Sequence, residues 1–170
     1  VFNIKGWDYT VQELLCDDLL AQRYEKGICL IFRLCVDDYH RYCYIDGGCK
    51  GENIHINGEL HTVQPIAQEK VKVFARNDRE YTVLDTDHFG IVTQIEIGAL
   101  MVGKITNWHG AGRIEKGQEK GCFEFGGSTI VLLLEENAVE MDKQIFDDTE
   151  NGLETAVKLG QTVAKAGVSV

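Results

Sequence analysis

Turn signals divide the middle of the chain into short stretches that are too brief for typical helices. The stretches KVKVFA, EYTVLDT and IVTQIEI are rich in β-branched residues, and turn-forming pairs with glycine or asparagine separate them. In IVTQIEI, Thr93, Ile95 and Ile97 alternate with Gln94 and Glu96, which predicts a strand with one face in solvent. This rhythm predicts a mainly β (α+β) fold, an antiparallel sandwich or barrel-like domain.

One amphipathic helix is expected near the N-terminal end. Thr10, followed three residues later by Glu13, forms a capping-box signature, and Gly27 is a stop signal. Apolar residues between them share one helical face: Val11, Leu14, Leu15 and Leu19. The pattern predicts a helix over residues 10–24, followed by a strand over residues 28–36 that is buried on both faces.

Length and composition restrict the class of protein. The 170 residues fit one domain, residues 1–170, and the formal net charge of -10 comes without any basic run that could follow phosphates. Nucleic acid is therefore not an expected partner. The longest uncharged apolar run, residues 130–134, is far shorter than the roughly 20 residues of a membrane-spanning helix. Six cysteines without a zinc-like spacing indicate reduced thiols in a cytoplasmic protein, and no metal site is expected.

Two stretches near the C-terminal end are ambiguous from the residues alone. ETAVKLGQTVAKAG fits a helix by its composition, or a strand and turn by its valines and glycines. FEFGGST, residues 123–129, precedes the apolar run IVLLLE, and its glycines and hydroxyl residues are typical of a turn or bulge before a core strand. Taken alone, Gly-Gly-Ser-Thr is a weak motif.

Its context makes the motif more specific. The segments DDYHR, GELHTVQPIA, VFARNDREYTVLDT, FGIVTQIEIGALMVGKI and KGQEKGCFEFGGSTIVLLL follow one another along the chain. In this order they resemble phosphatidylserine decarboxylase, a pyruvoyl-dependent enzyme, over about residues 4–160. The Gly-Ser-Thr element and DDYHR are the specific parts of this resemblance, and the resemblance implies that an N-terminal segment of the family precedes Val1.

The resemblance implies a self-processing enzyme that is cut between Gly127 and Ser128. A β chain would end at Gly127, and an α chain would begin at Ser128, which becomes a pyruvoyl cofactor. The glycine carbonyl is sterically open to attack by the Ser128 hydroxyl. The Thr129 hydroxyl is a candidate donor to the resulting oxyanion. The pyruvoyl carbonyl would form a Schiff base with the substrate amine and accept electrons as carbon dioxide leaves.

The resemblance also suggests roles for histidines. His40, in DDYHR, corresponds to the family histidine that is linked to decarboxylation, and an imidazole suits proton delivery near neutral pH. A second family histidine, three residues later, acts with an aspartate as base for self-cleavage. Cys43 stands there in this chain, and its thiol is a weaker base than imidazole. His61 is the expected replacement, and the partner aspartate is expected before Val1.

Three functions fit these features. The first is conversion of phosphatidylserine to phosphatidylethanolamine by a peripheral protein at the cytoplasmic face of the membrane, with a homodimer compatible with the sequence. Lys116 and Lys120, in a hairpin loop, are candidate contacts to the phosphate of the head group. The second is pyruvoyl-dependent decarboxylation of a soluble amino acid. The third is an unprocessed β-domain that acts as a binding module, which the cysteine at position 43 favours.

Overall fold

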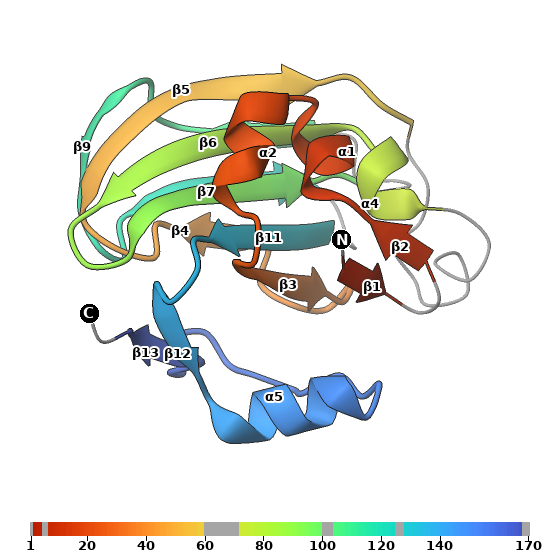
Figure 1. The fold of residues 1–170 in the computed structure, drawn as a ribbon. Coiled ribbons are helices and arrows are strands. Elements are labelled where there is room, and N and C mark those ends of the chain that lie inside the picture. Colours follow the sequence, from red (N-terminus) through yellow and green to blue (C-terminus); the bar gives the residue numbers. More distant parts are fainter. Residues whose placement is uncertain (1, 5–6, 60–71, 100–103, 125–127, 168–170) are drawn as a thin grey trace.

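The computed structural model describes residues 2–4, 7–59, 72–99, 104–124 and 128–167. It is mainly β with antiparallel strand pairing, which confirms the predicted fold class. Figure 1 shows the strands β3, β11, β7, β6 and β5 side by side, with the helices α1, α2 and α4 in front of them. Within the described ranges, no helix combines the length and the apolar character needed to span a bilayer.

The largest sheet has six strands in the order β3-β11-β7-β6-β5-β9. Their bounds are β3 (Ile28–Leu34), β11 (Ser128–Leu134), β7 (Gly90–Ile97), β6 (Arg79–Thr86), β5 (Gly48–Ile56) and β9 (Gly112–Ile114). The predicted strands EYTVLDT and IVTQIEI are confirmed as β6 and β7. Strand β11 lies between β3 and β7, so the segment that begins at Ser128 is hydrogen-bonded along both edges.

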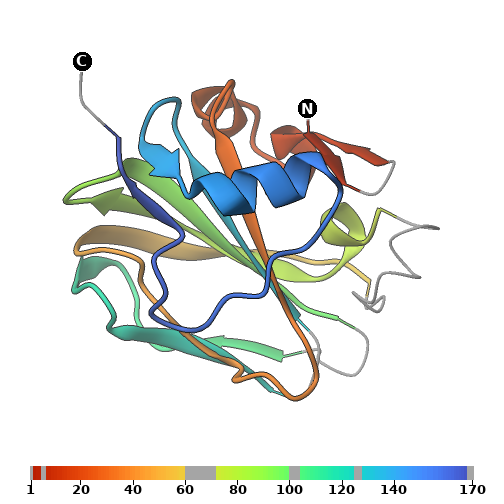
Figure 2. The same ribbon diagram turned by 90° about the horizontal axis from the view of Figure 1, so that it is seen from below.

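A second sheet of three strands packs on one face of the large sheet. It has the order β4-β10-β8, with β4 (Arg41–Cys43), β10 (Glu119–Glu124) and β8 (Lys104–Asn107). Tyr42 and Phe123 of this sheet pack against Leu34 and Ile130 of the large one. Figure 2 shows the two layers, with the N-terminal helices on the opposite side of the large sheet.

The other face of the large sheet is covered by three short helices, α1 (Val11–Leu15), α2 (Asp18–Arg23) and α4 (Val73–Arg76). Their buried residues form one apolar cluster with the sheet: Tyr9, Leu14, Leu15, Tyr24, Phe74, Tyr81, Ile95, Ile97, Val131 and Leu133. The capping box of Thr10 and Glu13 is confirmed, since each side chain accepts a hydrogen bond of 3.0 Å from the other residue's backbone N–H.

The prediction of one helix over residues 10–24 was wrong. Cys16 adopts the left-handed conformation, with φ 52°, and ends α1, while the Asp17 side chain accepts from Leu20 N–H and starts α2. This break turns Leu19 away from the core, and it is 81% exposed. The part of KVKVFA that the structure describes also differs from its predicted strand, because it forms the helix α4.

Two predictions of strand burial were also wrong. Gln94 and Glu96 of β7 are buried, since the second sheet covers the face that was expected to meet solvent. Strand β3 is an edge strand and only half-buried along its length. An edge position and a covered face both depend on distant segments, so a local pattern of residues does not reveal them.

The C-terminal part of the chain lies below the large sheet in Figure 1. A short helix, α5 (Lys143–Glu150), connects β12 (Val139–Met141) to β13 (Ala164–Ala166), and these strands pair with each other. The ambiguous stretch ETAVKLGQTVAKAG therefore contains a strand and a turn, not a helix. Arg33 of β3 forms an ion pair of 2.6 Å with Glu154, which attaches this segment to the sheet.

Candidate functional site

Ser128 is the first residue of β11 and has 0% of its surface exposed. It pairs with Leu34 of β3, and Leu34 packs against Tyr42 and Phe123 of the second sheet. The Ser128 hydroxyl has no hydrogen-bond partner among the described residues. A buried hydroxyl without a partner is unfavourable in a structural role. The predicted nucleophile therefore lies at a rigid strand end in an apolar environment.

Thr129 is also fully buried, and its hydroxyl likewise finds no partner within the described part of the chain. It pairs with Ile97, which belongs to the cluster under the helices. Successive side chains of a strand point to opposite faces, so the hydroxyls of Ser128 and Thr129 lie on different sides of the sheet. The predicted oxyanion role of Thr129 requires the preceding chain to approach from the helix side.

His40 lies between β3 and β4, at the end of the sheet where β11 begins. Its backbone carbonyl accepts from Phe123 N–H at 3.0 Å, and its ring makes an edge contact with the Phe123 ring at 6.4 Å. Its Nδ1 lies 2.7 Å from the Asp38 carbonyl oxygen. Because a carbonyl only accepts, Nδ1 carries a proton in this contact. Phe123, which also packs with Leu34, connects His40 to the Ser128 end.

Cys43 occupies the position of the second histidine in the resemblance. Burial raises the pKa of its thiol, so the group is protonated at neutral pH and cannot accept a proton. Tyr42 and Tyr44, on either side of it, are buried. Since neighbours in a strand point to opposite faces, the Cys43 side chain points away from the layer that these tyrosines enter. The structure thus offers no role for Cys43 as a base.

The sequence did not reveal a buried ion pair between the two sheets. Lys120 Nζ of β10 lies 2.7 Å from Glu96 Oε2 of β7, and both side chains are 0% exposed. Asn107 of β8 joins them, because its Oδ1 accepts from Lys120 at 2.8 Å and its Nδ2 donates to Glu96 Oε2 at 3.2 Å. Asn107 Nδ2 also donates to Glu80 Oε1 at 2.5 Å.

This burial overturns one prediction about the hairpin loop. Lys120 lies inside β10 and is covered on all sides, so it cannot contact a lipid head group. Lys116 is exposed, 6.0 Å from the centre of the Phe89 ring. Lysine and glutamate are read as surface residues in a sequence, and the strand alternation around Glu96 suggested solvent on that side. The pair forms only because the second sheet packs on the large sheet and brings Lys120 against Glu96.

Two of the predicted site residues, His61 and Gly127, lie outside the described residues. The other described histidines lie away from Ser128. His55 of β5 pairs with Asp78 at 3.1 Å, His88 in the β6–β7 turn contacts Asp46 at 3.0 Å, and His109 Nδ1 lies 3.2 Å from Tyr44 Oη. His88 is exposed, and His109 is half-buried beside Tyr44.

Comparison with known proteins addresses the family. The family model described as phosphatidylserine decarboxylase matches residues 1–165. The chain belongs to the phosphatidylserine decarboxylase family. Phosphatidylserine decarboxylase proenzyme 2 of Clostridium acetobutylicum is 53% identical over 163 residues, which are 96% of this chain and 56% of that protein.

Other members of the family show the same coverage. The phosphatidylserine decarboxylase proenzyme of Ruminiclostridium cellulolyticum is 46% identical over 165 residues, 96% of this chain and 55% of that protein. The proenzyme of Clostridium tetani is 42% identical over 167 residues, 97% of this chain and 56% of that protein. The chain thus spans little more than half the length of these relatives.

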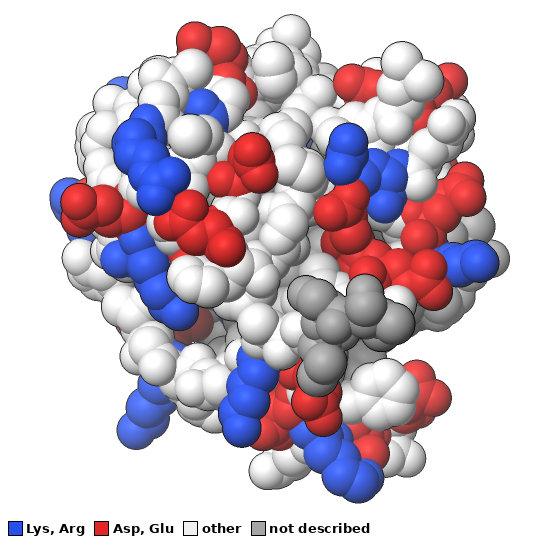
Figure 3. Space-filling view, turned by 60° about the vertical axis from the view of Figure 1, so that its left-hand side comes forward, with Lys and Arg blue, Asp and Glu red and all other residues white. Residues whose placement is uncertain are grey.

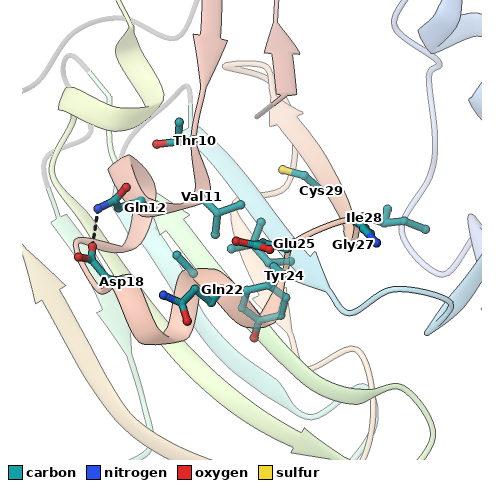
Figure 4. Close-up of a pocket in the computed structure, with 13 residues that line it drawn as sticks. Thr10, Val11, Gln12, Asp18, Gln22, Tyr24, Glu25, Gly27, Ile28 and Cys29 are labelled. Atoms are coloured by element: carbon teal, nitrogen blue, oxygen red, sulfur yellow. Dashed lines mark hydrogen bonds between the residues drawn. The ribbon is translucent and has the colours of Figure 1, made fainter.

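A cleft in this chain lies between the N-terminal helices and β3 (Figure 4). Its lining includes Gln12, Asp18, Tyr24, Cys29 and Leu133, and Gln12 donates to Asp18 at 2.5 Å. Leu133 pairs with Cys29 five positions along β11 from Ser128, which is roughly 17 Å at the rise of a strand. The cleft is therefore separate from the site at Ser128.

The surface of the chain carries charges of both signs. On the face in Figure 3, acidic and basic side chains are interspersed, and no single-sign region dominates. With a formal net charge of -10, the chain as a whole is not attracted to anionic surfaces.

Proposed function

We propose that this chain carries the self-processing serine of a pyruvoyl-dependent decarboxylase that converts phosphatidylserine to phosphatidylethanolamine. The observation that carries the proposal is Ser128. Its hydroxyl is buried and has no partner among the described residues, and it belongs to the Gly-Ser-Thr element to which the resemblance assigns self-cleavage. An unpartnered buried hydroxyl at a strand end is unfavourable for folding alone and is explained by a reactive role.

The proposed self-cleavage begins with attack of Ser128 Oγ on the carbonyl carbon of Gly127. An ester then replaces the peptide bond, and β-elimination releases the Gly127 carboxylate as the end of the β chain and leaves dehydroalanine at position 128. Hydrolysis of this residue with one water would release ammonia and leave the pyruvoyl group at the start of the α chain. The apolar neighbours of Ser128, including Leu34, exclude water that would otherwise compete with the hydroxyl. Strand pairing of β11 on both edges keeps the reacting end in place.

A pyruvoyl group at position 128 fits this environment. The position is buried, and its side-chain oxygen has no described partner that would have to be displaced. The group supplies the electron-accepting carbonyl that decarboxylation of an amino acid requires. His40 is proposed to deliver a proton from Nε2 when its ring carries both protons, while the Asp38 carbonyl and the Phe123 ring hold the ring in orientation.

The proposed substrate also implies a location for the protein. A phospholipid substrate requires contact with a membrane, and we propose peripheral attachment at the cytoplasmic face. Because the net charge is -10, attachment is expected through apolar or amphipathic elements and not through general attraction to anionic lipid. A homodimer stays a prediction, which sedimentation of the full-length protein tests.

Intact-mass spectrometry on the full-length protein made in cells tests the proposal, with Ser128→Ala as the uncleavable control. We expect two chains in the unsubstituted protein, the second beginning at position 128 with a blocked N-terminus. Decarboxylation of phosphatidylserine in vesicles, compared with free serine, then separates the lipid enzyme from one that acts on a soluble amino acid. A single unbroken chain in both samples would show the unprocessed binding module that Cys43 favours.

A further inference from the structure

Two buried oxygens without described partners lie on one face of neighbouring strands. One is Ser128 Oγ of β11 and the other is Glu96 Oε1 of β7. Glu96 pairs directly with Ile130, so these two side chains share a face, and Ser128 shares it because it lies two positions from Ile130. Figure 1 shows the two strands side by side.

The register places Ser128 and Glu96 in a diagonal relation. Thr129 pairs with Ile97, so the position opposite Ser128 falls at Gly98, which carries no side chain. Diagonal neighbours in an antiparallel sheet are about 7–8 Å apart at their Cα atoms, within reach of a long side chain. The two oxygens are not hydrogen-bonded to each other in the structure, so a proton would pass between them through one water, or after a rotamer change of Glu96 over Gly98.

The second sheet holds Glu96 by one of its oxygens. Lys120 Nζ and Asn107 Nδ2 both donate to Oε2, at 2.7 and 3.2 Å, which leaves Oε1 for a further donor. The ammonium group favours the ionised carboxylate, while burial raises the pKa of Glu96 above its ordinary value. A carboxylate with a raised pKa is a stronger proton acceptor than one in water.

The other described groups on this face are less suitable proton acceptors, and His61, the base expected from the resemblance, lies outside the described residues. The Cys43 thiol is protonated and points away from this layer, and Gln94, the other unpartnered side chain on this face of β7, is not a base. Glu80 lies directly across from Glu96 on β6, one strand farther from Ser128. Among the described side chains on this face, Glu96 is the carboxylate on the strand adjacent to Ser128.

We propose that Glu96 accepts the proton of the Ser128 hydroxyl during self-cleavage, and that Lys120 and Asn107 position its carboxylate. The inference rests on the proposed self-processing function. As Ser128 Oγ bonds to the carbonyl carbon of Gly127, its proton passes to Glu96. The bond from that carbon to the Ser128 nitrogen then breaks, and the nitrogen takes the proton back from Glu96. The products are an ester and an amine, and Glu96 is regenerated.

The test follows cleavage of newly made full-length protein over time by gel and intact mass. Glu96→Gln keeps the size of the side chain and removes its basicity, and Glu119→Gln is the matched control outside this cluster, at a carboxylate of β10 that pairs with Arg41. We expect Glu96→Gln to slow cleavage by about 10²–10⁴-fold, the usual contribution of a general base, and Glu119→Gln to change it by less than about fivefold. Hydroxylamine at neutral pH cleaves the ester, so it should leave the Gly127–Ser128 bond of Glu96→Gln intact; the intact mass separates this from hydroxylamine cleavage at the Asn-Gly bonds of residues 57–58 and 151–152.

A second variant keeps the test informative if Glu96→Gln alone fails to fold. Glu96→Gln combined with Lys120→Met removes the ion pair without leaving an unpaired buried charge. We expect this protein to fold, by its circular dichroism and thermal midpoint, and to stay uncleaved. Cleavage of either folded variant at the unsubstituted rate overturns the role of Glu96 and leaves the proposed function intact. An unsubstituted protein that never cleaves removes the proposed function and this inference together.

Discussion

The two faces of the six-stranded sheet bury different kinds of side chain, although they share the same strands. On β7, Ile95 and Ile97 enter the apolar cluster under the helices, while Gln94 and Glu96 enter the layer between the two sheets. Near the start of β11 that second layer contains an ion pair, an amide and the Ser128 hydroxyl. The helix face supplies stability through apolar burial, and the other face holds groups that can exchange protons.

The difference between the two faces shows where this fold can bury ionisable groups. Charged groups between two sheets are unfavourable unless they are paired and hydrogen-bonded, and Lys120, Glu96 and Asn107 meet that condition except at Glu96 Oε1. Apolar residues on the same face, such as Leu132 and Leu134, continue the layer toward the other end of β11. The helix face also buries polar groups, such as Arg79, which donates to the carbonyls of Leu14 and Glu13, but the fully buried ion pair lies on the second-sheet face.

The largest expected effect on stability comes from breaking the ion pair on the polar face. Lys120→Met leaves the Glu96 carboxylate buried without its cation, so we expect a loss of about 3–5 kcal/mol in the free energy of unfolding. Adding Glu96→Gln should recover most of this loss. Urea denaturation of Lys120→Met and of the double variant measures the difference in the free energy of unfolding. If Lys120→Met alone is as stable as the unsubstituted protein, the ion pair does not stabilise this face.

On the apolar face, truncation of a core residue is the corresponding test. Ile95→Ala removes methyl groups from a fully buried position next to Glu96, so the free energy of unfolding should fall by about 2–5 kcal/mol. Because Ile95 points away from Ser128, self-cleavage should proceed at a near-normal rate at temperatures where the variant is folded. Urea denaturation and a cleavage time course check the two parts, with Ile95→Val as the milder control.

A smaller effect is expected where the helices begin. Thr10→Ala removes the acceptor for Glu13 N–H and with it one half of the capping box, which should lower the free energy of unfolding by about 1 kcal/mol. Glu25→Ala, at an exposed position, serves as a control that should change stability by less than about 0.5 kcal/mol. Equal effects in both variants would show that the cap does not stabilise this face.

The smallest effect is a dependence on acid. Lys72 and the Thr10 backbone N–H lower the pKa of Glu13 below its usual 4.5. Because the folded-state pKa is depressed, Glu13 contributes stability above the unfolded value, and this contribution is lost as the pH falls through the folded value. Thermal midpoints of the unsubstituted protein should therefore approach those of Glu13→Gln between about pH 5 and pH 3. A constant gap over this range would contradict the assignment.

Local sequence patterns predicted the positions of helices and strands better than they predicted which faces of these elements are buried. Alternation in IVTQIEI and EYTVLDT led to β7 and β6, and the capping box led to the start of α1. The helix was nevertheless predicted as one element, because no sequence rule required Cys16 to take the left-handed conformation. KVKVFA was read as a strand from its valines, but the described part forms a helical turn that packs against α1.

The candidate site was predicted in part. Ser128 and His40 came from motifs that are contiguous in the chain, and the structure places them at the same end of the sheet through Leu34 and Phe123. Their catalytic roles and those of His61, Gly127 and Thr129 stay predictions. Glu96 and Lys120 were read as solvent-facing residues, because their contact joins positions 24 residues apart on different sheets.

The sequence by itself determined the strands β6, β7 and β11, the capped start of the first helix, and Ser128 as the residue that precedes the apolar run of β11. These properties depend on the chemistry of neighbouring residues, on alternation and on hydrogen bonds over three positions. The tertiary structure alone decided that the second face of β7 meets another sheet and not water. Strand periodicity separates two faces but does not say what covers each one, because burial depends on the packing of residues far apart in the chain.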